Sequence, residues 1–182
     1  GIHWEEIELD SFWYVLNVTY CKDRFIAVGT GEKGGFILTS LGNIKWMKQE
    51  VGVNWLYEVT WSGDTFVAVG QEGIFSSSDR KEWKRLGLKN TTLYGVTYGN
   101  SLFVAVGEGE TIVSRGGIDW VERGGVIFTS PDGVNWIKRN INAPLLYDVA
   151  YGNGVFVAMG KNIILTSQNG VDWKQQGGGE IN

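Results

Sequence analysis

The chain contains few of the cysteine and histidine residues that most metal sites and nucleophilic active sites use. It contains one cysteine, Cys21, and one histidine, His3, among 182 residues. A single cysteine excludes an internal disulfide, and small residues stand at its equivalent places in the repeats described below, so we interpret Cys21 as a packing residue. A histidine with no second ligand nearby is typical of a surface position. We therefore expect neither a metal ion nor a cofactor.

Basic charge and long apolar runs are also scarce. The net charge is −4, and no basic stretch is longer than Arg80-Lys81. Because phosphate binding depends on clustered lysine and arginine, this distribution excludes a nucleic-acid partner. No apolar run approaches the ~20 residues of a membrane-spanning helix, so we expect no membrane span.

Glycine and tryptophan, by contrast, are abundant: there are 27 Gly and 9 Trp beside only 2 Pro. The segment Thr129–Trp136 shows how the chain uses them. An apolar run, Gly125–Phe128, leads into Thr-Ser, an Asp-Gly pair follows, and a tryptophan opens the next stretch. Asp-Gly favours a tight turn because glycine adopts positive φ and the aspartate accepts turn amides. The segment predicts two antiparallel strands joined by one turn.

The same frame recurs, always with one spacing between a serine and a tryptophan. The five copies run from Ser40 to Trp46, Ser77 to Trp83, Ser114 to Trp120, Ser130 to Trp136 and Ser167 to Trp173. Asp132, followed by Gly133, and Asp79 carry the acid of the turn, whereas Asn169 replaces it in the last copy and glycine in two others. A group that is absent from three copies is interpreted as turn-forming rather than catalytic.

Two further motifs precede each turn. A Phe-x-Ala-x-Gly strand recurs at Phe25–Gly29, Phe66–Gly70, Phe103–Gly107 and Phe156–Gly160. A strand of the Tyr-x-Val-Thr-Tyr type precedes it at Leu16–Tyr20, Tyr57–Trp61, Tyr94–Tyr98 and Tyr147–Tyr151. One repeat therefore holds four short strands, here called A to D in chain order, and returns about every 37 residues. No window sustains helical spacing.

These repeats predict an all-β fold in a single domain, residues 1–182. Four-stranded units that are apolar on both faces must stack on their neighbours, and radial stacking gives a β-propeller, with a linear solenoid as the alternative. The count favours five blades, one of them without its A–B hairpin, and leaves six blades or an incomplete ring open. The expected repeats span residues 1–10 (strand D only), 14–49, 55–88, 92–123, 124–140 (strands C and D only) and 145–176.

Two irregularities bear on how complete the ring is. The chain opens inside a repeat, at Gly1–Trp4, which suggests processing or a piece of a longer protein. Between Gly124 and Gly125 the spacing passes from one strand D directly to another strand C. A hairpin absent from the sequence, a natural loss tolerated in an incomplete ring, or a gap filled by another chain, self-association included, would each explain this, and we favour the first.

The Ser-x-Asp-Gly-x-x-Trp hairpins around Ser130 and Ser77 resemble the Asp-box repeats of bacterial-neuraminidase-type β-propellers. The resemblance covers nearly the whole chain. It implies a propeller fold, and it implies a bacterial, extracellular or cell-surface protein, since similar repeats are common among exported bacterial proteins. In that family the box lies on the outer part of each blade, remote from the active site, so the resemblance supports the fold and lends nothing to catalysis.

An enzymatic function finds little support in the residues. A sialidase needs three converging arginines, and no arginine lies on any strand A. A glycosidase needs two opposed carboxylates, and Glu58 and Asp148 occupy the same place in two A strands. We favour the interpretation that they are solvated residues lining a channel. We therefore expect no enzyme, with a glycoside hydrolase as the alternative.

The connections between repeats carry the least repeated residues, and they predict a binding face. Trp13, Tyr14 and Trp55 supply aromatic groups there, with Glu58 and Asp148 beside them. Aromatic groups with acidic neighbours suit a basic protein or a glycan. We predict a non-enzymatic binding or scaffold module, with a glycan-binding, lectin-like module as the alternative. Trp13 and Trp55 could instead pack between repeats as wedges.

Overall fold

The computed structural model describes residues 13–21, 23–41, 45–115 and 118–176, without the side chains of residues 41, 111–115 and 118–121. Within these ranges every regular element is a β-strand and none is a helix, which confirms the all-β prediction. Consequently, the described part of the chain holds no helix long and apolar enough to cross a membrane.

The strands form three antiparallel sheets. They are β1 (Tyr14–Cys21), β2 (Arg24–Gly31), β3 (Gly34–Leu41), β4 (Lys45–Glu50), β5 (Leu56–Trp61), β6 (Phe66–Ser77), β7 (Lys84–Gly99), β8 (Leu102–Arg115), β9 (Ile118–Ser130), β10 (Ile137–Arg139), β11 (Leu146–Gly152), β12 (Val155–Gly160), β13 (Ile163–Ser167) and β14 (Lys174–Gln175). The first and last sheets have the orders β1-β2-β3-β4 and β11-β12-β13-β14, and the middle sheet has the order β10-β9-β8-β7-β6-β5.

The six-stranded sheet holds two repeats that share strand β7. The start of β7, Lys84–Gly87, pairs with Gly73–Ser76 of β6, whereas the rest, Thr91–Gly99, pairs with β8. Asn90 lies between the two parts with a φ of 56°, in the left-handed region. This strand therefore acts as the last strand of one repeat and the first strand of the next.

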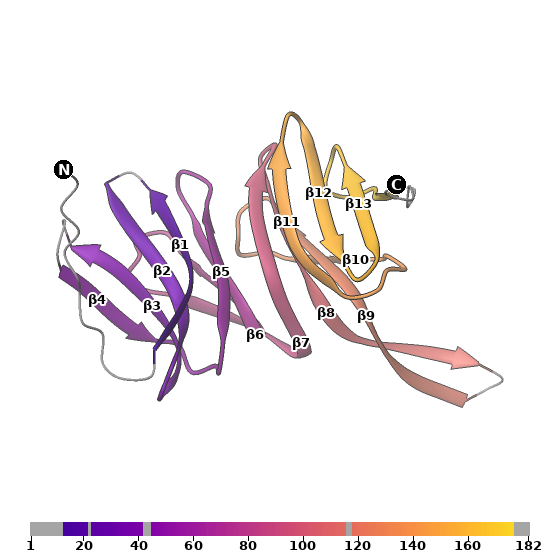
Figure 1. The fold of residues 1–182 in the computed structure, drawn as a ribbon, viewed down its shortest axis with the longest axis horizontal. Helices are drawn as coiled ribbons and strands as arrows, with labels where there is room; N and C mark the ends of the chain where they lie inside the picture. The colour runs from indigo at the N-terminus through magenta and orange to yellow at the C-terminus, as the bar shows by residue number, and fades with distance from the viewer. Residues whose placement is uncertain (1–12, 22, 42–44, 116–117, 177–182) are drawn as a thin grey trace, which may run out of the picture.

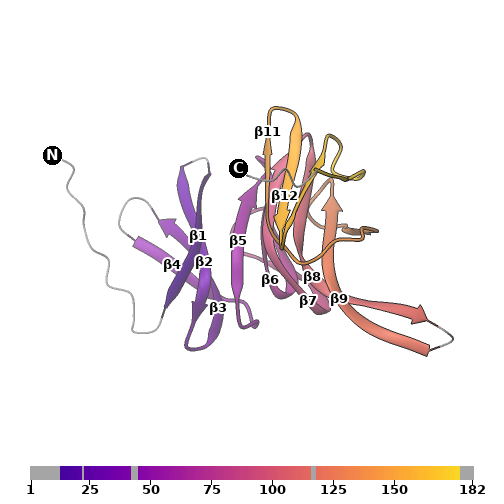
Figure 2. The ribbon, with the colours of Figure 1, turned by 45° about the vertical axis from the view of Figure 1, so that its right-hand side comes forward.

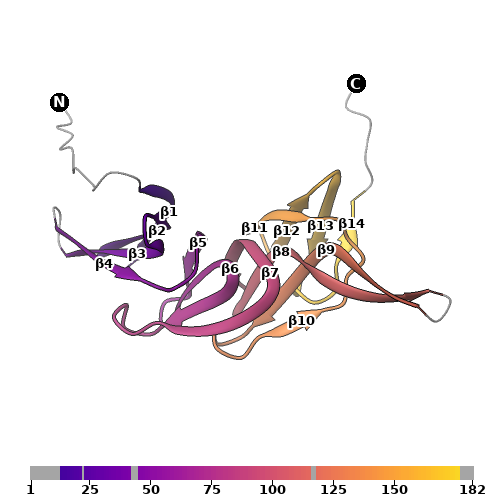
Figure 3. The same ribbon diagram turned by 90° about the horizontal axis from the view of Figure 1, so that it is seen from below.

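The repeats stand side by side in a row. The sheet β1–β4 lies at one end, β5 to β10 lie in the middle, and β11–β14 lie at the other end (Figure 1). After a 45° turn β1–β4 still lie at one end with β5 next to them, while β11 and β12 overlap the middle sheet in the view (Figure 2). Viewed from below, the row is bent, with β6 and β7 at the bend (Figure 3).

The core lies between successive repeats, in three clusters of buried side chains. In the first cluster Ile26, Val28 and Ile37 of the first sheet pack against Val59 and Phe66 of the second repeat. The other two clusters repeat this pattern one and two repeats further along the chain. Burial of apolar surface between repeats therefore stabilises the row, as expected for units that cannot bury both faces alone.

An irregularity in strand A explains the glycine of the Phe-x-Ala-x-Gly motif. In all four repeats the register of strand A shifts by one residue, for example between Leu93 and Gly95, which leaves Tyr94 as the extra residue of a β-bulge. The bulge brings the carbonyl oxygen of Thr92 within 2.0 Å of where a Cβ on Gly107 would lie. Only glycine fits against the bulge at this position.

A long hairpin arm, β8–β9, projects from the row (Figure 1). The two strands pair continuously from Phe103 opposite Ser130 to Arg115 opposite Ile118. The repeat spacing predicted separate outer strands in this arm, followed by a gap between Gly124 and Gly125. Instead, β9 runs through both glycines, and its end, Val126–Ser130, supplies strand C for the third A–B pair. The arm is thus an extension of strands B and C.

Candidate functional site

The turn after Ser130 is held by two oxygen atoms. The Ser130 hydroxyl oxygen accepts hydrogen bonds from the N–H groups of Asp132, at 3.3 Å, and Gly133, at 2.9 Å. Oδ1 of Asp132 accepts the N–H groups of Val134 and Asn135 at 2.9 and 2.8 Å, and it also accepts the Ser130 hydroxyl. These donors lower the pKa of Asp132, the N–H of Asn135 most strongly.

The tryptophan of the repeat closes the same turn. The indole N–H of Trp136 donates to the carbonyl oxygen of Gly133 at 3.0 Å, and its ring packs near Phe103, with centroids 6.2 Å apart. Trp173 makes the matching bond to Gly170, also at 3.0 Å. The buried indole N–H of Trp83 has no hydrogen-bond partner, and Arg80, with a φ of 68°, stands where the other two turns have glycine.

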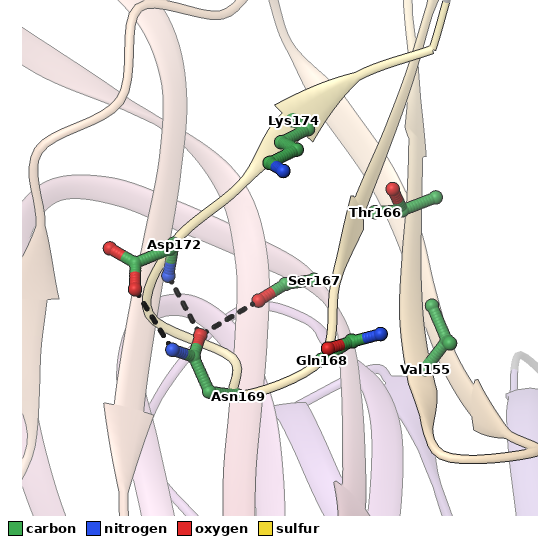
Figure 4. A pocket seen from close by; sticks show the side chains of 7 residues that line it. All are labelled: Val155, Thr166, Ser167, Gln168, Asn169, Asp172 and Lys174. Atoms are coloured by element: carbon green, nitrogen blue, oxygen red, sulfur yellow. Dashed lines mark hydrogen bonds between the residues drawn. The ribbon is translucent and has the colours of Figure 1, made fainter.

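Asn169 shows that the turn does not need a charge. Its Oδ1 accepts the N–H groups of Val171 and Asp172 at 2.9 Å each and the hydroxyl of Ser167 at 3.1 Å. A surface pocket of about 450 Å³ lies over this turn (Figure 4). Three of its polar side chains bond to one another, since Asn169 accepts the Ser167 hydroxyl and its amide donates to Asp172 at 2.9 Å, and these bonds hold the turn itself.

The turn after Ser77 follows the same scheme of serine and aspartate acceptors. Oδ1 of Asp79 accepts the N–H groups of Lys81 and Glu82 at 2.9 Å each. These bonds, that of Glu82 first, lower the pKa of Asp79. Ser40 accepts the N–H of Phe25 at 2.9 Å. The Trp46 ring packs on the core of the first sheet, and the side chains of Ser114 and Trp120 lie outside the described residues.

Glu58 does not face an open channel, in contrast to the prediction. Its Oε2 accepts the backbone N–H of Val96, on the next repeat, at 2.6 Å. Burial raises the pKa of Glu58 to about 7, and the negative charge of Asp148 adds to the rise, while the Val96 N–H opposes it. Asn17 makes the equivalent contact one repeat earlier, accepting the N–H of Val59 at 3.4 Å. Glu58 therefore links two repeats.

Asp148 occupies the same place in the last repeat, and it is exposed. Its Oδ1 accepts the N–H of the adjacent Val149 at 2.7 Å. The preceding repeat has Gly95 at this place, and a Cβ there would lie 2.9 Å from the Asp148 Cα. Asp148 thus accepts the hydrogen bond of the Val149 N–H itself, because Gly95, at the place of Glu58 in the preceding repeat, has no side chain that could accept it.

Trp13 lies apart from the other predicted aromatic residues. Its ring packs against Phe36, with centroids 5.1 Å apart, and Lys48 Nζ lies 3.8 Å from the centre of the Trp13 ring. Trp13 therefore covers the core of the first sheet, and the wedge interpretation, in which it packs between two repeats, stays a prediction.

Tyr14 and Trp55 belong to a continuous row of four rings, here called the aromatic row. Centroid distances are 6.4 Å from Tyr14 to Trp55, 6.2 Å from Trp55 to Tyr57, and 5.1 Å from Tyr57 to Tyr94. Trp55 and Tyr57 are nearly parallel, at 8°. The row crosses three successive repeats where their A strands begin, and the Tyr14 and Trp55 rings are exposed.

The aromatic row ends at an ion pair between Glu108 and Arg123. The Tyr94 hydroxyl donates to Oε1 of Glu108 at 3.0 Å, and Arg123 Nη1 lies 3.2 Å from the same oxygen. Burial, followed by the bond to Glu108, raises the pKa of Tyr94 to about 12. Burial and the Glu108 charge also raise the pKa of Tyr57. Both phenols therefore stay neutral and keep a hydrogen-bond donor at neutral pH.

A pocket of about 380 Å³ adjoins the basic end of the row. Arg123 lines it, together with the loop residues Ile141, Asn142, Ala143 and Pro144. The N–H of Gly125 donates to the Ala143 carbonyl oxygen at 2.7 Å, which fixes the loop against the base of the arm. The aromatic row, the Glu108–Arg123 pair and this pocket form the candidate site.

Sequence reasoning placed Tyr14 and Trp55 in the candidate site but missed Tyr57, Tyr94 and Arg123. In the sequence the two tyrosines are ordinary residues of a strand pattern. In the structure each is the extra residue of a β-bulge, which the sequence pattern does not reveal. Arg123 lies far along the chain in the arm. Among the described residues, no group of three or more His, Cys, Asp or Glu side chains is placed to hold a metal ion.

The fold and site define an all-β protein of stacked antiparallel repeats with an aromatic face. No protein-family model and no curated protein matches the chain. The fold is similar to Myxococcus xanthus glutaminyl cyclase, with a TM-score of 0.46 and 14% identity over 87% of this chain and 67% of that one. A chain from a Saccharomyces cerevisiae complex of Dbp5 with Nup159, Gle1, IP6 and ADP also matches, with a TM-score of 0.46 and 11% identity. That match covers 89% of this chain and 47% of the other, about half its length.

The prediction that the chain is not an enzyme is wrong. An enzyme, glutaminyl cyclase, is among the solved structures of similar fold. A repeat pattern that builds the fold does not exclude catalysis, because function depends on side chains and loops that differ between proteins of one fold.

Proposed function

We propose that the chain is a protein-binding module, and that the aromatic row holds its partner. The observation that carries the proposal is the continuous row Tyr14–Trp55–Tyr57–Tyr94, which leaves the first two rings exposed and ends on Glu108 and Arg123. Tyrosine, tryptophan and arginine are the residue types that dominate the binding energy of protein interfaces.

The charge of this face suggests a basic partner. Glu32, Glu72 and Glu110 lie on the B–C ends of three repeats, the ends that also carry Glu108, and the chain is acidic overall with a net charge of −4. Complementary charge speeds association and selects between partners. A basic protein surface with an apolar centre would therefore match both the rings and the acids.

In this proposal the repeats are blades of a β-propeller, and the chain is a relative of the Asp-box proteins. The hydrogen bonds around Ser130–Asp132 and Ser167–Asn169 support this because they repeat the same turn in successive units. The four complete A–B pairs correspond to four blades in the described residues.

The test compares Trp55→Ala with Ile137→Ala, an exposed position on β10 outside the aromatic row. Both variants and the wild type are used to capture proteins from an extract of the source organism, and a captured protein is then purified for binding measurements. We expect the Kd to rise at least tenfold for Trp55→Ala, as for a hot-spot residue, and to stay within twofold for Ile137→Ala. Equal binding by both variants would contradict the proposal.

A glycan is the second candidate ligand. The exposed Trp55 ring and the Glu108 carboxylate at the far end of the aromatic row suit the apolar face and the hydroxyls of a sugar. A glycan array probed with the wild type and both variants separates the candidates. A saccharide whose binding is lost in Trp55→Ala and kept in Ile137→Ala, with no captured protein that depends on Trp55, would favour the glycan.

A further inference from the structure

Three rings of the aromatic row, Trp55, Tyr57 and Tyr94, lie on the two repeats in the middle of the described chain. Tyr57 belongs to β5, Trp55 directly precedes that strand, and Tyr94 belongs to β7. Buried clusters join these repeats to a neighbour on either side. Even so, Trp55 is 38% exposed and the two tyrosines are half-buried. The rings therefore form a surface where both repeats are already covered by their neighbours.

Hydrogen-bond donors lie along this surface. In the part of the chain that the structure describes, neither the indole N–H of Trp55 nor the hydroxyl of Tyr57 donates to another protein group. Burial and the Glu108 charge raise the pKa of Tyr57, so this hydroxyl keeps its proton at neutral pH. Tryptophan and tyrosine at interfaces normally use these groups as donors. Both groups can therefore bind carbonyl oxygens of a ligand.

The spacing of the rings suits an extended peptide in the polyproline II conformation. This helix has no internal hydrogen bonds, so its carbonyl oxygens accept external donors, and aromatic-lined surfaces bind it. It rises about 3.1 Å per residue, so two residues advance about 6.2 Å. The ring centroids of Trp55 and Tyr57 are 6.2 Å apart, and those of Tyr57 and Tyr94 are 5.1 Å apart. Successive rings thus meet about every second residue of such a peptide.

An acidic group without a cationic partner lies beyond the last ring. Glu108 and Glu110 stand two residues apart on β8, so their side chains share one face of the strand. Glu108 pairs with Arg123 at 3.2 Å. Glu110 accepts the neutral amide of Asn90 at 2.7 Å, and no basic side chain of the described residues pairs with it. An arginine or lysine of the ligand would supply the missing charge.

We propose that the aromatic row binds a proline-rich segment in the polyproline II conformation, with an arginine or lysine near one end that pairs with Glu110. This inference rests on the proposed function, since it names the kind of protein segment that the row holds. The rings and their donors select the conformation, and the acid sets the direction of the chain. Because a polyproline II segment is ordered before it binds, it loses little conformational entropy on a shallow surface.

The probe for this inference is a fluorescein-labelled peptide with a continuous polyproline core followed by two arginines, and fluorescence polarisation measures its binding. Every register of this core presents proline, so a wrong spacing cannot explain a failure. One control peptide has alternating glycine and serine in place of the prolines, and another has glutamates in place of the arginines. We expect the wild type to bind the probe with a micromolar Kd and each control peptide at least tenfold more weakly. Equal binding of the glycine-serine peptide, or no binding of the probe up to millimolar concentration, would overturn the proposal.

Variants of the chain test each part of the contact, with folding checked by circular dichroism. Trp55→Ala should raise the Kd for the probe at least tenfold, and Ile137→Ala should leave it within twofold. Tyr57→Phe keeps the ring but removes the donor, and it should raise the Kd about two- to tenfold. Binding that is unchanged in both Trp55→Ala and Tyr57→Phe would overturn the proposal.

The charge pairing has its own test. Glu110→Gln should weaken binding of the probe and leave unchanged the binding of a polyproline peptide without arginine, since only the ion pair is lost. Equal affinity of this variant and the wild type for the probe would overturn the assigned pairing.

The outcome also separates this inference from the proposed function. If a captured protein depends on Trp55 but the probe does not bind, the polyproline II ligand is wrong and the protein-binding function stands. If neither capture nor probe binding depends on Trp55, both are wrong.

Discussion

At the scale of single residues, the turn acids and Glu58 are structural groups. Charged Asp132 and neutral Asn169 accept hydrogen bonds from equivalent backbone N–H groups in their two turns. The turn therefore depends on the acceptor oxygen and not on its charge. Glu58 accepts the N–H of the next repeat from a half-buried position. The sequence shows which residues recur, but it does not show that a carboxylate on one strand will meet an amide on another repeat.

The raised pKa of Glu58 makes stability fall as pH rises. Because the pKa is about 7 in the folded chain and 4.5 for the free group, folding favours the neutral acid, and its contribution is full below about pH 4.5 and lost above pH 7. Glu58→Gln keeps an acceptor for Val96 without the charge. Urea unfolding should find the variant more stable by about 1–3 kcal/mol at pH 8.5 and equal to the wild type at pH 4.5. Glu32→Gln, at an exposed turn, is the control and should show no such pH dependence. A variant that is less stable at pH 8.5 would contradict the account.

The lowered pKa of Asp132 has the opposite sign. Its contribution is present above the ordinary aspartate range, near pH 4, and is lost progressively as the pH falls below that range. Asp132→Asn should be slightly less stable than the wild type at pH 7, since Asn169 shows that an amide can replace the acid. Thermal melts at pH 7 and pH 2.5 should show this difference in Tm shrink or reverse in acid. A difference that is unchanged at pH 2.5 would count against the role assigned to the carboxylate.

At the scale of strands, the sequence predicted most of the repeat and missed its irregular parts. The alternation of apolar residues and the Asp-Gly and Asn-Gly turns placed the A–B and C–D hairpins. The bulge at Tyr94 and the continuous arm β8–β9 were missed, because both depend on which strand a segment pairs with. Spacing along the chain cannot distinguish an extra hairpin from an extension of two existing strands.

The bulge also gives a test at this scale. Gly107→Ala would place a Cβ 2.0 Å from the carbonyl oxygen of Thr92, so strand A must shift. We expect a loss of roughly 1–3 kcal/mol in the free energy of unfolding, as for an overpacked core. Gly87→Ala is the matched control, because a Cβ at Gly87 meets nothing within 4 Å. Equal effects of the two substitutions would show that the close approach to strand A is not what requires glycine.

At the scale of the whole molecule, stacking assembles the aromatic row and buries apolar side chains between the described repeats. Tyr14, Tyr57 and Tyr94 come from three repeats and meet only because the repeats pack in order. The same packing buries Val59 and Ile37 between repeats, whereas Val18 and Ile164, at equivalent places in the first and last described repeats, are exposed. Equivalent residues are buried or exposed according to their place in the row, which the sequence of one repeat does not reveal.

The most direct test of this account is the affinity of the Trp55→Ala variant for a captured protein partner, measured beside the wild type and the Ile137→Ala control. Because Trp55 lies inside the continuous aromatic row, we predict a Kd at least tenfold higher for Trp55→Ala and within twofold of the wild type for Ile137→Ala. A Trp55→Ala variant that binds as tightly as the wild type would contradict the claim that the aromatic row holds the partner.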